Sequence, residues 1–540
     1  MDWERHLLVV PILLPLAAGA ALLLVEEVRH TLKATISMAA TLALLVVAIV
    51  LLRMADGNGG DAQSMSYAVA SWPAPFAIVL VLDRLSALML VTTAILALAA
   101  LAFSLTRWDR AGPHFHSLFQ FLLMGLGGAF LTGDLFNLFV FFEVTLAASY
   151  GLLLHGSGSF RVRSGLHYIA INLAASLLFL IGVSLIYGVT GTLNMADLAV
   201  RIGQVSADDR MLLQAGAGIL GVAFLVKAGM WPLGLWLPPA YMAAAAPVGA
   251  VFVILTKVGV YVLLRLSLLL FGGLSGDMAG FGNMALLWGG LATLAFATSG
   301  VLASQAMGRL AGYSVLISSG TLLAAVGMGN IAVVSGALFY LVSSTFAAAA
   351  FFMLIELVER AREPGADLLA VTMEAYGDER EETEEPEDEE IGVVMPGALA
   401  VLGVSFGCIA LLLAGLPPLS GFVAKFAILK GMLDGNSLAD GEIPVGAWIV
   451  MALVILSGLA ALVAMMRTGI RTFWAPLETV VPRVLVIEMA PILTLIGLCF
   501  AMTFSGGTLI RYTDAASRAL HEPAGYVQGV LGDNREKADR

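Results

Sequence analysis

Four ionisable residues lie within long apolar segments of the sequence: Glu143, Lys227, Lys257 and Lys425. A charged side chain at the centre of a bilayer costs at least about 2.5 to 3.5 kcal/mol on insertion scales, so residues of this kind are rare and mark functional sites. Burial disfavours the charged form of lysine and glutamate, and a nearby opposite charge restores it. A lysine beside a carboxylate can therefore switch its proton. These four residues are the candidates for proton transfer.

Their positions favour a role inside the membrane. Glu143 lies about nine residues after Asp134, which is about 13 Å along a helix that rises 1.5 Å per residue. Its short side chain cannot reach the interface, as a long lysine side chain does when it snorkels. Lys227 precedes one proline-containing break, Lys425 follows another, and Lys257 lies in the apolar segment after the first. A static salt bridge remains the alternative for each, and for the lysines snorkelling of the side chain to the interface is a second one.

A second group of polar residues gives weaker signals. Ser343, Ser344 and Thr345 follow one another in an apolar segment, where they either hydrogen-bond water on a proton path or bond the preceding helical turn. Asp83 and Arg84 open another apolar segment, and we expect them to form a pair at the membrane interface.

Two histidines are placed near basic residues. His155 and His167 flank a loop that carries Arg161 and Arg163. For these two histidines we expect a solvated surface position rather than proton uptake.

The elements that position these residues are predicted to be membrane-spanning helices. Hydrophobic residues make up 59% of the 540 residues and charged residues 12%, whereas an average soluble domain is about a quarter charged. Apolar segments recur from residue 7 to residue 504, and about 14 of them are long enough to cross a hydrocarbon core about 30 Å thick. The sequence predicts an all-α polytopic membrane protein.

Loop charges predict an orientation, because cytoplasmic loops collect Lys and Arg. Alternate loops carry many basic residues: Arg29, Lys33, Arg107, Arg110, Arg161, Arg163, Arg309, Arg360, Arg362, Arg380, Arg467, Arg471 and Arg483. The loops between them carry only Arg53, Arg201 and Arg210. We therefore expect both termini on the non-cytoplasmic side of a bacterial cell membrane. The acidic run at 379–390, which supplies most of the net charge of −11, would be a cytoplasmic loop.

The chain contains a weak internal repeat. The segment 228–233 reads AGMWPL, and 186 residues later the segment 414–419 reads AGLPPL. Two units of five helices each, an odd number, would be inverted relative to each other, which is a common transporter architecture with broken helices near the working site. We predict N-terminal helices 1–3 in 1–106, a first repeat of helices 4–8 in 107–270, a second repeat of helices 9–13 in 283–466 with a cytoplasmic loop at 359–391, and a final helix with a polar tail in 467–540. Helices 7 and 12 would be broken.

The sequence offers little for cofactor or metal chemistry. The two cysteines, Cys408 and Cys499, form no CxxC pair and lie in apolar segments, so disulfides, iron–sulfur ligation and zinc sites are not expected. The seven histidines lie at helix ends, in loops or in tails, which does not fit paired haem ligands within helices. We expect no cofactor, no metal and no nucleic-acid partner.

The segment around Glu143 resembles a known family. Residues 132–144 read TGDLFNLFVFFEV, which is similar to the fifth helix of the D subunit of Mrp-type (Mnh or Pha) multisubunit cation/proton antiporters. The resemblance extends to most of the chain except the acidic loop and the C-terminal tail, with further matching segments at 83–89, 227–233, 237–238, 415–422, 425–426 and 471–474.

The resemblance implies a function and a set of roles. In this family Glu143 and Lys227 would form a paired switch, Lys257 a central relay and Lys425 the lysine at the exit of the second repeat. The chain would work with other membrane subunits, as a secondary transporter rather than an enzyme, and exchange cytoplasmic Na⁺ or K⁺ for external protons. The alternative is an antiporter-like proton-pumping subunit of complex I or of a membrane-bound hydrogenase. A scaffold subunit that moves no protons is a further possibility.

The chain departs from the family at one place. Many relatives have a histidine and then a lysine in the eleventh helix, where this chain has Ser343, Ser344 and Thr345. If protons pass this helix, serine hydroxyls and water must carry them.

Overall fold

The computed structural model describes residues 3–57, 64–69, 72, 78–360, 397–433, 445–473 and 484–538. The acidic run at 379–390 lies outside these residues, as does nearly all of the predicted cytoplasmic loop 359–391.

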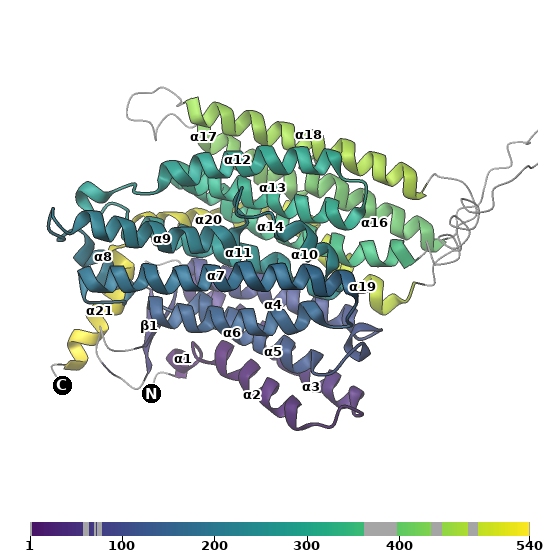
Figure 1. The fold of residues 1–540 in the computed structure, drawn as a ribbon, viewed down its shortest axis with the longest axis horizontal. Helices are drawn as coiled ribbons and strands as arrows, with labels where there is room; N and C mark the ends of the chain where they lie inside the picture. The colour runs from purple at the N-terminus through teal and green to yellow at the C-terminus, as the bar shows by residue number, and fades with distance from the viewer. Residues whose placement is uncertain are drawn as a thin grey trace, which may run out of the picture.

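The described chain forms a bundle of long helices (Figure 1). Twelve of them are long and apolar enough to cross a membrane, and α2 and α5 are shorter apolar helices. These confirm the all-α polytopic fold and agree with the expected number of spans. The sequence did not predict the small antiparallel hairpin of β1 (Met65–Ala68) and β2 (Val79–Leu82). The helices up to the first break are α1 (Trp3–His6), α2 (Val10–Leu24), α3 (His30–Asp56), α4 (Arg84–Ser104), η2 (Trp108–Arg110), α5 (Phe115–Leu131), α6 (Leu135–Leu154), α7 (Ser159–Thr190), α8 (Met195–Ile202) and α9 (Arg210–Ala228).

The remaining helices complete the bundle and extend beyond it. They are α10 (Leu237–Ala243), α11 (Ala246–Leu270), η3 (Gly276–Met278), α12 (Asn283–Ala303), α13 (Met307–Met328), α14 (Ile331–Glu359), α16 (Gly397–Ala414), α17 (Ser420–Leu433), α18 (Val445–Phe473), α19 (Val486–Phe504), α20 (Gly506–His521) and α21 (Ala524–Ala538). Helices α11, α13 and α14 are almost entirely buried by the others. They form the centre of the molecule, and α11 carries Lys257.

Both predicted helix breaks are present, and their backbones have the same geometry. The first separates α9 from α10, and the second separates α16 from α17. Each contains a glycine in the left-handed conformation, Gly229 or Gly415, with φ at 75°. In each, the residue after the glycine donates its N–H over 3.0 Å to the carbonyl five positions earlier. The two breaks therefore match at the offset that the sequence repeat indicates, while the boundaries of the two repeats stay a prediction.

The two ends of the described chain lie at the same end of the bundle (Figure 1). The segment predicted as a polar tail forms α20 and α21. Tyr512 of α20 donates a hydrogen bond to the carbonyl of Arg84 over 2.9 Å, and Ser517 donates one to the carbonyl of Ile331 over 2.7 Å. The tail is thus packed against the start of α4 and the start of α14.

Candidate functional site

Lys227 occupies the last turn of α9, directly before the first break. Its side chain is 5% exposed. Gly229 ends the helix in the left-handed conformation that a helix C-terminus commonly adopts. The partial negative charge of a helix C-terminus stabilises a nearby cation. The break therefore supplies part of the environment that an ammonium group needs inside the bundle.

Glu143 lies near the middle of α6, as the sequence predicted, but it is not bonded to Lys227. Within the described residues neither Glu143 Oε1 nor Lys227 Nζ makes a hydrogen bond. Lys227 Nζ instead lies 4.9 Å from the centre of the Phe142 ring, a cation–π distance. Phe142 directly precedes Glu143 in α6, so Lys227 lies beside the turn that carries the carboxylate. The two groups are thus neighbours that are not closed into a salt bridge.

A small cavity connects Lys227 to polar side chains of α7. Lys227, Tyr168 and Asn172 line a cavity of about 20 Å³, which is about the space that one water molecule needs. The Tyr168 hydroxyl shares a hydrogen bond of 2.8 Å with Ser149 of α6. Polar groups therefore continue from Lys227 toward the end of α6.

Lys257 lies in the middle of α11 and is fully buried. Its Nζ donates a hydrogen bond to Ser318 Oγ on α13. Ser318 Oγ in turn shares a hydrogen bond of 2.8 Å with Ser344 Oγ on α14. Hydrogen bonds between side chains of neighbouring helices are a typical polar contact within membrane proteins. The three buried central helices are thus joined at the level of Lys257 by one lysine and two serines.

Ser343 connects the same helix to the second break. Its Oγ shares a hydrogen bond of 2.8 Å with Ser420 Oγ, at the first residue of α17. Ser343, Ser344 and Ser318 line one small cavity. Thr345 differs, because its hydroxyl donates to the carbonyl of Leu341 in its own helix over 2.6 Å. Ser343 and Ser344 therefore contact other helices, although Ser344 also donates to the carbonyl of Leu341 over 3.3 Å, whereas Thr345 bonds the preceding turn.

Lys425 lies one turn into α17 and is 5% exposed. Its Nζ donates to the carbonyl of Ala414 over 2.9 Å, and to that of Leu413 over 3.3 Å. These carbonyls are the last two of α16, which the break leaves without helical partners. Lys425 therefore caps the first half of its own broken helix.

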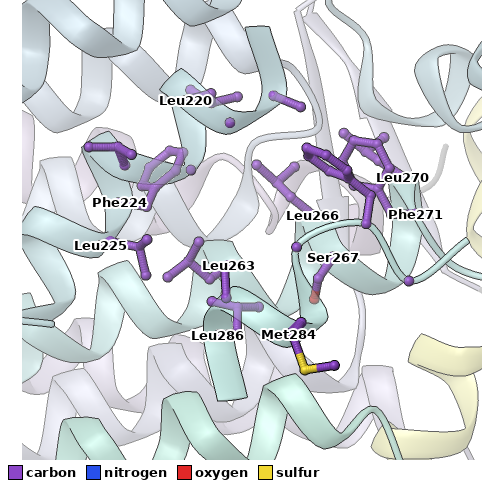
Figure 2. Close-up of a pocket in the computed structure, with 18 of the residues that line it drawn as sticks. Leu220, Phe224, Leu225, Leu263, Leu266, Ser267, Leu270, Phe271, Met284 and Leu286 are labelled. Carbon is purple, nitrogen blue, oxygen red and sulfur yellow. The ribbon is translucent and has the colours of Figure 1, made fainter. Parts of the chain in front are cut away.

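A large cavity near these helices is apolar and lies apart from the charged residues. It has a volume of about 530 Å³. Figure 2 shows its lining, which includes Leu220, Phe224, Leu263 and Met284. Of the described residues that line it, only Ser267 has a polar side chain, and none of the four candidate residues is among them. An ion or proton finds no charged partner in that lining.

The structure contains a buried ion pair that the sequence did not predict. Asp83 accepts two hydrogen bonds of 2.8 Å from the guanidinium of Arg265, which lies two turns beyond the lysine of α11. Asp83 also caps α4 by accepting from the Ser86 N–H over 2.8 Å. The sequence indicated a local pair of Asp83 with Arg84, and this was wrong: Arg84 contacts Asp56 instead.

The surface position predicted for both histidines is correct for His167 and wrong for His155. His167 is exposed, but His155 is 5% exposed. The loop after α4 covers its imidazole, and Arg161 donates a hydrogen bond of 2.7 Å to its backbone carbonyl. Among the described residues, no group of three or more His, Cys, Asp or Glu side chains is placed to hold a metal ion.

Comparison with known proteins decides the family. Residues 132–440 match the family model described as "NADH:quinone oxidoreductase/Mrp antiporter, TM". This chain belongs to that family. It is 59% identical over 537 residues to a protein of Rhizobium meliloti (strain 1021) named as the probable D subunit of a K⁺/H⁺ antiporter, and the match covers 99% of both chains. It is 34% identical over 536 residues to the D subunit of an Na⁺/H⁺ antiporter of Bacillus subtilis (strain 168), covering 98% of this chain and 99% of the relative.

Solved structures agree with this assignment. A chain in the structure of the Mrp complex from Dietzia sp. DQ12-45-1b is 26% identical and has a TM-score of 0.82, covering 98% of this chain and 100% of that one. A chain of the membrane-bound sulfane sulfur reductase, an archaeal respiratory membrane complex, has a TM-score of 0.80 at 24% identity and shows the shared fold alone. The relatives named as D subunits and the chain of the Mrp complex are parts of larger complexes.

Proposed function

We propose that this chain is the proton-translocating subunit of a multisubunit antiporter that exports K⁺ or Na⁺ in exchange for protons. The names of its relatives support antiport, and the relative at 59% identity supports K⁺ as the exported ion. The observation that carries the proton path is the hydrogen-bonded series of Lys257, Ser318 and Ser344 across three buried helices.

In this proposal Glu143 and Lys227 act as a switch. Among the described residues, Glu143 Oε1 and Lys227 Nζ have no hydrogen-bond partner, so a change of rotamer can bring the carboxylate to the ammonium or take it away. Closing the pair stabilises the charged lysine, and opening it favours release of the proton. The Phe142 ring, which holds the ammonium in the open arrangement, would be displaced as the pair closes.

The serines would carry protons between the two breaks. A hydroxyl is both a donor and an acceptor, so Ser318 and Ser344 can pass a proton away from Lys257 by exchanging hydrogen bonds. Ser343 and Ser420 would extend this route to the second break. There Lys425 donates to a carbonyl at the end of α16 that has no helical partner. This arrangement supplies a route through α14, the eleventh helix of the sequence prediction, without the histidine and lysine that many relatives have there.

The partners and the orientation belong to the same proposal. The chain would be one subunit among several in a bacterial cell membrane, with both termini on the non-cytoplasmic side and the acidic loop in the cytoplasm. The cation would pass through another subunit, because a lone Glu143 beside lysines is a poor cage for a hard cation that prefers several oxygen ligands. A proton-pumping subunit of a redox complex is less well supported, because the structures of respiratory complexes share only the fold.

Transport assays on the assembled complex test the proposal. In everted membrane vesicles energised to a proton gradient, Lys227→Ala and Glu143→Ala should abolish dissipation of that gradient by added K⁺ or Na⁺. Lys425→Ala should do the same, whereas Lys430→Ala, which changes an exposed lysine on the same helix, should leave transport unchanged. Exchange at the wild-type rate in the Lys227 and Glu143 variants would show that the chain is a scaffold.

A further inference from the structure

A second group of titratable side chains lies at the arginine-rich end of the first repeat and includes none of the four candidate residues of the proton path. It consists of Asp109 in η2, His116 in the first turn of α5 and His155 directly after α6. All three are buried, with exposures of 6%, 4% and 5%. The ring of Phe115 contacts both imidazoles, with ring centres 5.5 Å from His116 and 5.1 Å from His155. They therefore form one cluster.

The cluster is buried but its hydrogen bonding is incomplete. His116 Nε2 lies 3.9 Å from Asp109 Oδ2, beyond hydrogen-bond distance. Within the described residues, neither ring nitrogen of His116 makes a hydrogen bond, and neither does Asp109 Oδ1. Most buried polar groups in proteins are hydrogen-bonded, so an exception calls for an explanation. A proton passes between the two side chains only through a bridging water or after they approach, and the unused ring nitrogens of His116 leave both routes open.

His155 has one defined partner and one nitrogen that can accept a proton. Its Nε2 lies 2.7 Å from the carbonyl oxygen of Trp108, and a carbonyl only accepts, so Nε2 must carry the hydrogen. The lone pair of the neutral ring is then on Nδ1. That atom faces Gly112, where an added Cβ would lie 3.2 Å from it. A proton can therefore be accepted at Nδ1 without breaking the bond to Trp108.

The cluster lies between the surface and the polar groups that lead to Lys227. On its outer side, residues 111, 113 and 114 of the covering loop are exposed. On its inner side, α6 runs from His155 back to Ser149, whose hydroxyl is bonded to Tyr168. Tyr168 lines the same cavity as Lys227. Polar groups thus lie on both sides of the last turns of α6, and the segment between Ser149 and His155 separates the two sets.

Charged groups of both signs surround the cluster from each element packed against it. On its own segment, Arg110 Nε lies 4.0 Å from Asp109 Oδ1. Acidic and basic side chains also lie near the loop before α5, and one basic and one acidic side chain lie on the side of α7 and α14. These neighbouring groups are Glu27, Lys33 and His114 on one side, and Arg161 and Glu356 on the other. Arg107 also lies over the Trp108 ring, 5.7 Å from its centre, so these neighbours include more cations than carboxylates.

We propose that Asp109, His116 and His155 form a proton-exchange site, through which protons pass between the cytoplasmic surface and the Tyr168–Ser149 pair that leads to Lys227. This proposal rests on the proposed function. In each transfer Nδ1 of His155 accepts a proton that reaches it through water from the Tyr168 side, while the Tyr168 hydroxyl regains its own proton from the side of Lys227. Nδ1 then releases that proton through water to the His116–Asp109 pair, which passes it to solvent and returns to its starting state. No bond other than those to the moving proton forms or breaks.

The pH profile of transport tests this site. With the whole complex in everted vesicles, Asp109→Asn and His116→Gln should each lower the rate of cation-driven proton movement at least fivefold, and should flatten its dependence on pH between about 6 and 8, where histidine titrates. Asp109→Glu should restore both the rate and the profile. His167→Gln, an exposed histidine at the same end of the bundle, should match the wild type.

The outcomes separate this site from the proposed function. If Lys227→Ala abolishes transport while Asp109→Asn and His116→Gln keep a profile of wild-type shape, the exchange site is overturned and the antiporter function stands. If Lys227→Ala transports normally, the proposed function is overturned, and the exchange site that rests on it is overturned as well. Should the variants assemble poorly, infrared difference spectra of the purified wild-type complex between pH 6 and 8, with His116 labelled by isotope editing, decide the question. An imidazole signal that does not change with pH overturns the proposal.

Discussion

Asp83 and Arg265 form a bidentate ion pair between the N-cap of α4 and the last third of α11, 182 positions apart in the chain. The pair is 14% and 5% exposed, and the ring of Tyr526 from α21 lies 5.5 Å from the guanidinium carbon. Arg265 also contacts Tyr261, whose hydroxyl donates to the carbonyl of Phe130 over 2.7 Å. One cluster therefore joins α4, α5, α11 and the C-terminal helix two turns from the central lysine.

Breaking this pair should destabilise the protein more than breaking the exposed pair beside it. Asp83→Asn keeps the helix cap, because asparagine caps as well as aspartate, but it leaves Arg265 buried without its counter-charge, which costs about 3 to 5 kcal/mol. Asp56→Asn removes the exposed pair with Arg84, which is worth about 1 kcal/mol or less. Thermal unfolding of the purified complex, followed by tryptophan fluorescence, should show a far larger drop in Tm for Asp83→Asn. Equal drops would contradict a structural role for the pair.

The Ser318 hydroxyl should be needed for transport and the Thr345 hydroxyl should not. Ser318→Ala removes the partner of Lys257 Nζ, and a hydrogen bond to a charged group is worth about 1.5 to 3 kcal/mol, which corresponds to a rate loss of at least about tenfold. Ser318→Thr keeps a hydroxyl and should retain most of the activity. Thr345→Val removes a hydroxyl that bonds its own helix. The initial rate of proton movement in vesicles is the measurement, and equal rates for Ser318→Ala and Thr345→Val would exclude the serine route.

The sequence predicted the fold class and the two breaks, and it singled out the four charged residues, because each has a strong local signal. Each of these signals can be read within one segment: a long apolar run, a glycine followed within three residues by a proline, or a charge among apolar residues. Ser318 gave no such signal, because α13 also contains Ser314, Ser319 and Thr321, and only packing decides which of them faces Lys257. The Asp83–Arg265 pair was missed for the same reason, since contact between distant helices leaves no local pattern.

Gly415 should be required at the second break. Its φ of 75° is in the left-handed region, which costs a residue with a side chain about 1 to 2 kcal/mol. An added Cβ would also lie 2.5 Å from Cδ of Lys425, so Gly415→Ala should displace the lysine that caps α16. Gly407 lies within α16, the helix that ends directly before Gly415. Its replacement by Ala meets nothing within 4 Å and is the matched control. We expect Gly415→Ala to lose most transport and to lower the Tm, with Gly407→Ala like the wild type; retained activity in Gly415→Ala would show that the position of Lys425 is not critical.

Burial of His155 should make the stability of the protein depend on pH. Desolvation lowers the pKa of the His155 imidazole below its ordinary value, and the nearby positive charge of Arg161 adds to this effect. Because the unfolded chain has the ordinary value of about 6.5, it binds more protons than the folded protein just below that pH, so stability falls as the solution becomes more acidic. The stabilisation is present above about pH 6.5 and is lost as the pH falls through the lower pKa of the folded state.

The variant His155→Gln isolates this contribution. Glutamine does not titrate, and its side-chain amide can still donate to the Trp108 carbonyl, the acceptor nearest the imidazole. We expect the Tm of the wild-type complex to drop more steeply between about pH 7.5 and 5.5 than that of the variant, with the two curves closest at the acidic end because the wild type has lost its advantage there. His167→Gln, at an exposed site, should follow the wild-type curve. Parallel curves for His155→Gln and the wild type would mean that other groups control the acid sensitivity.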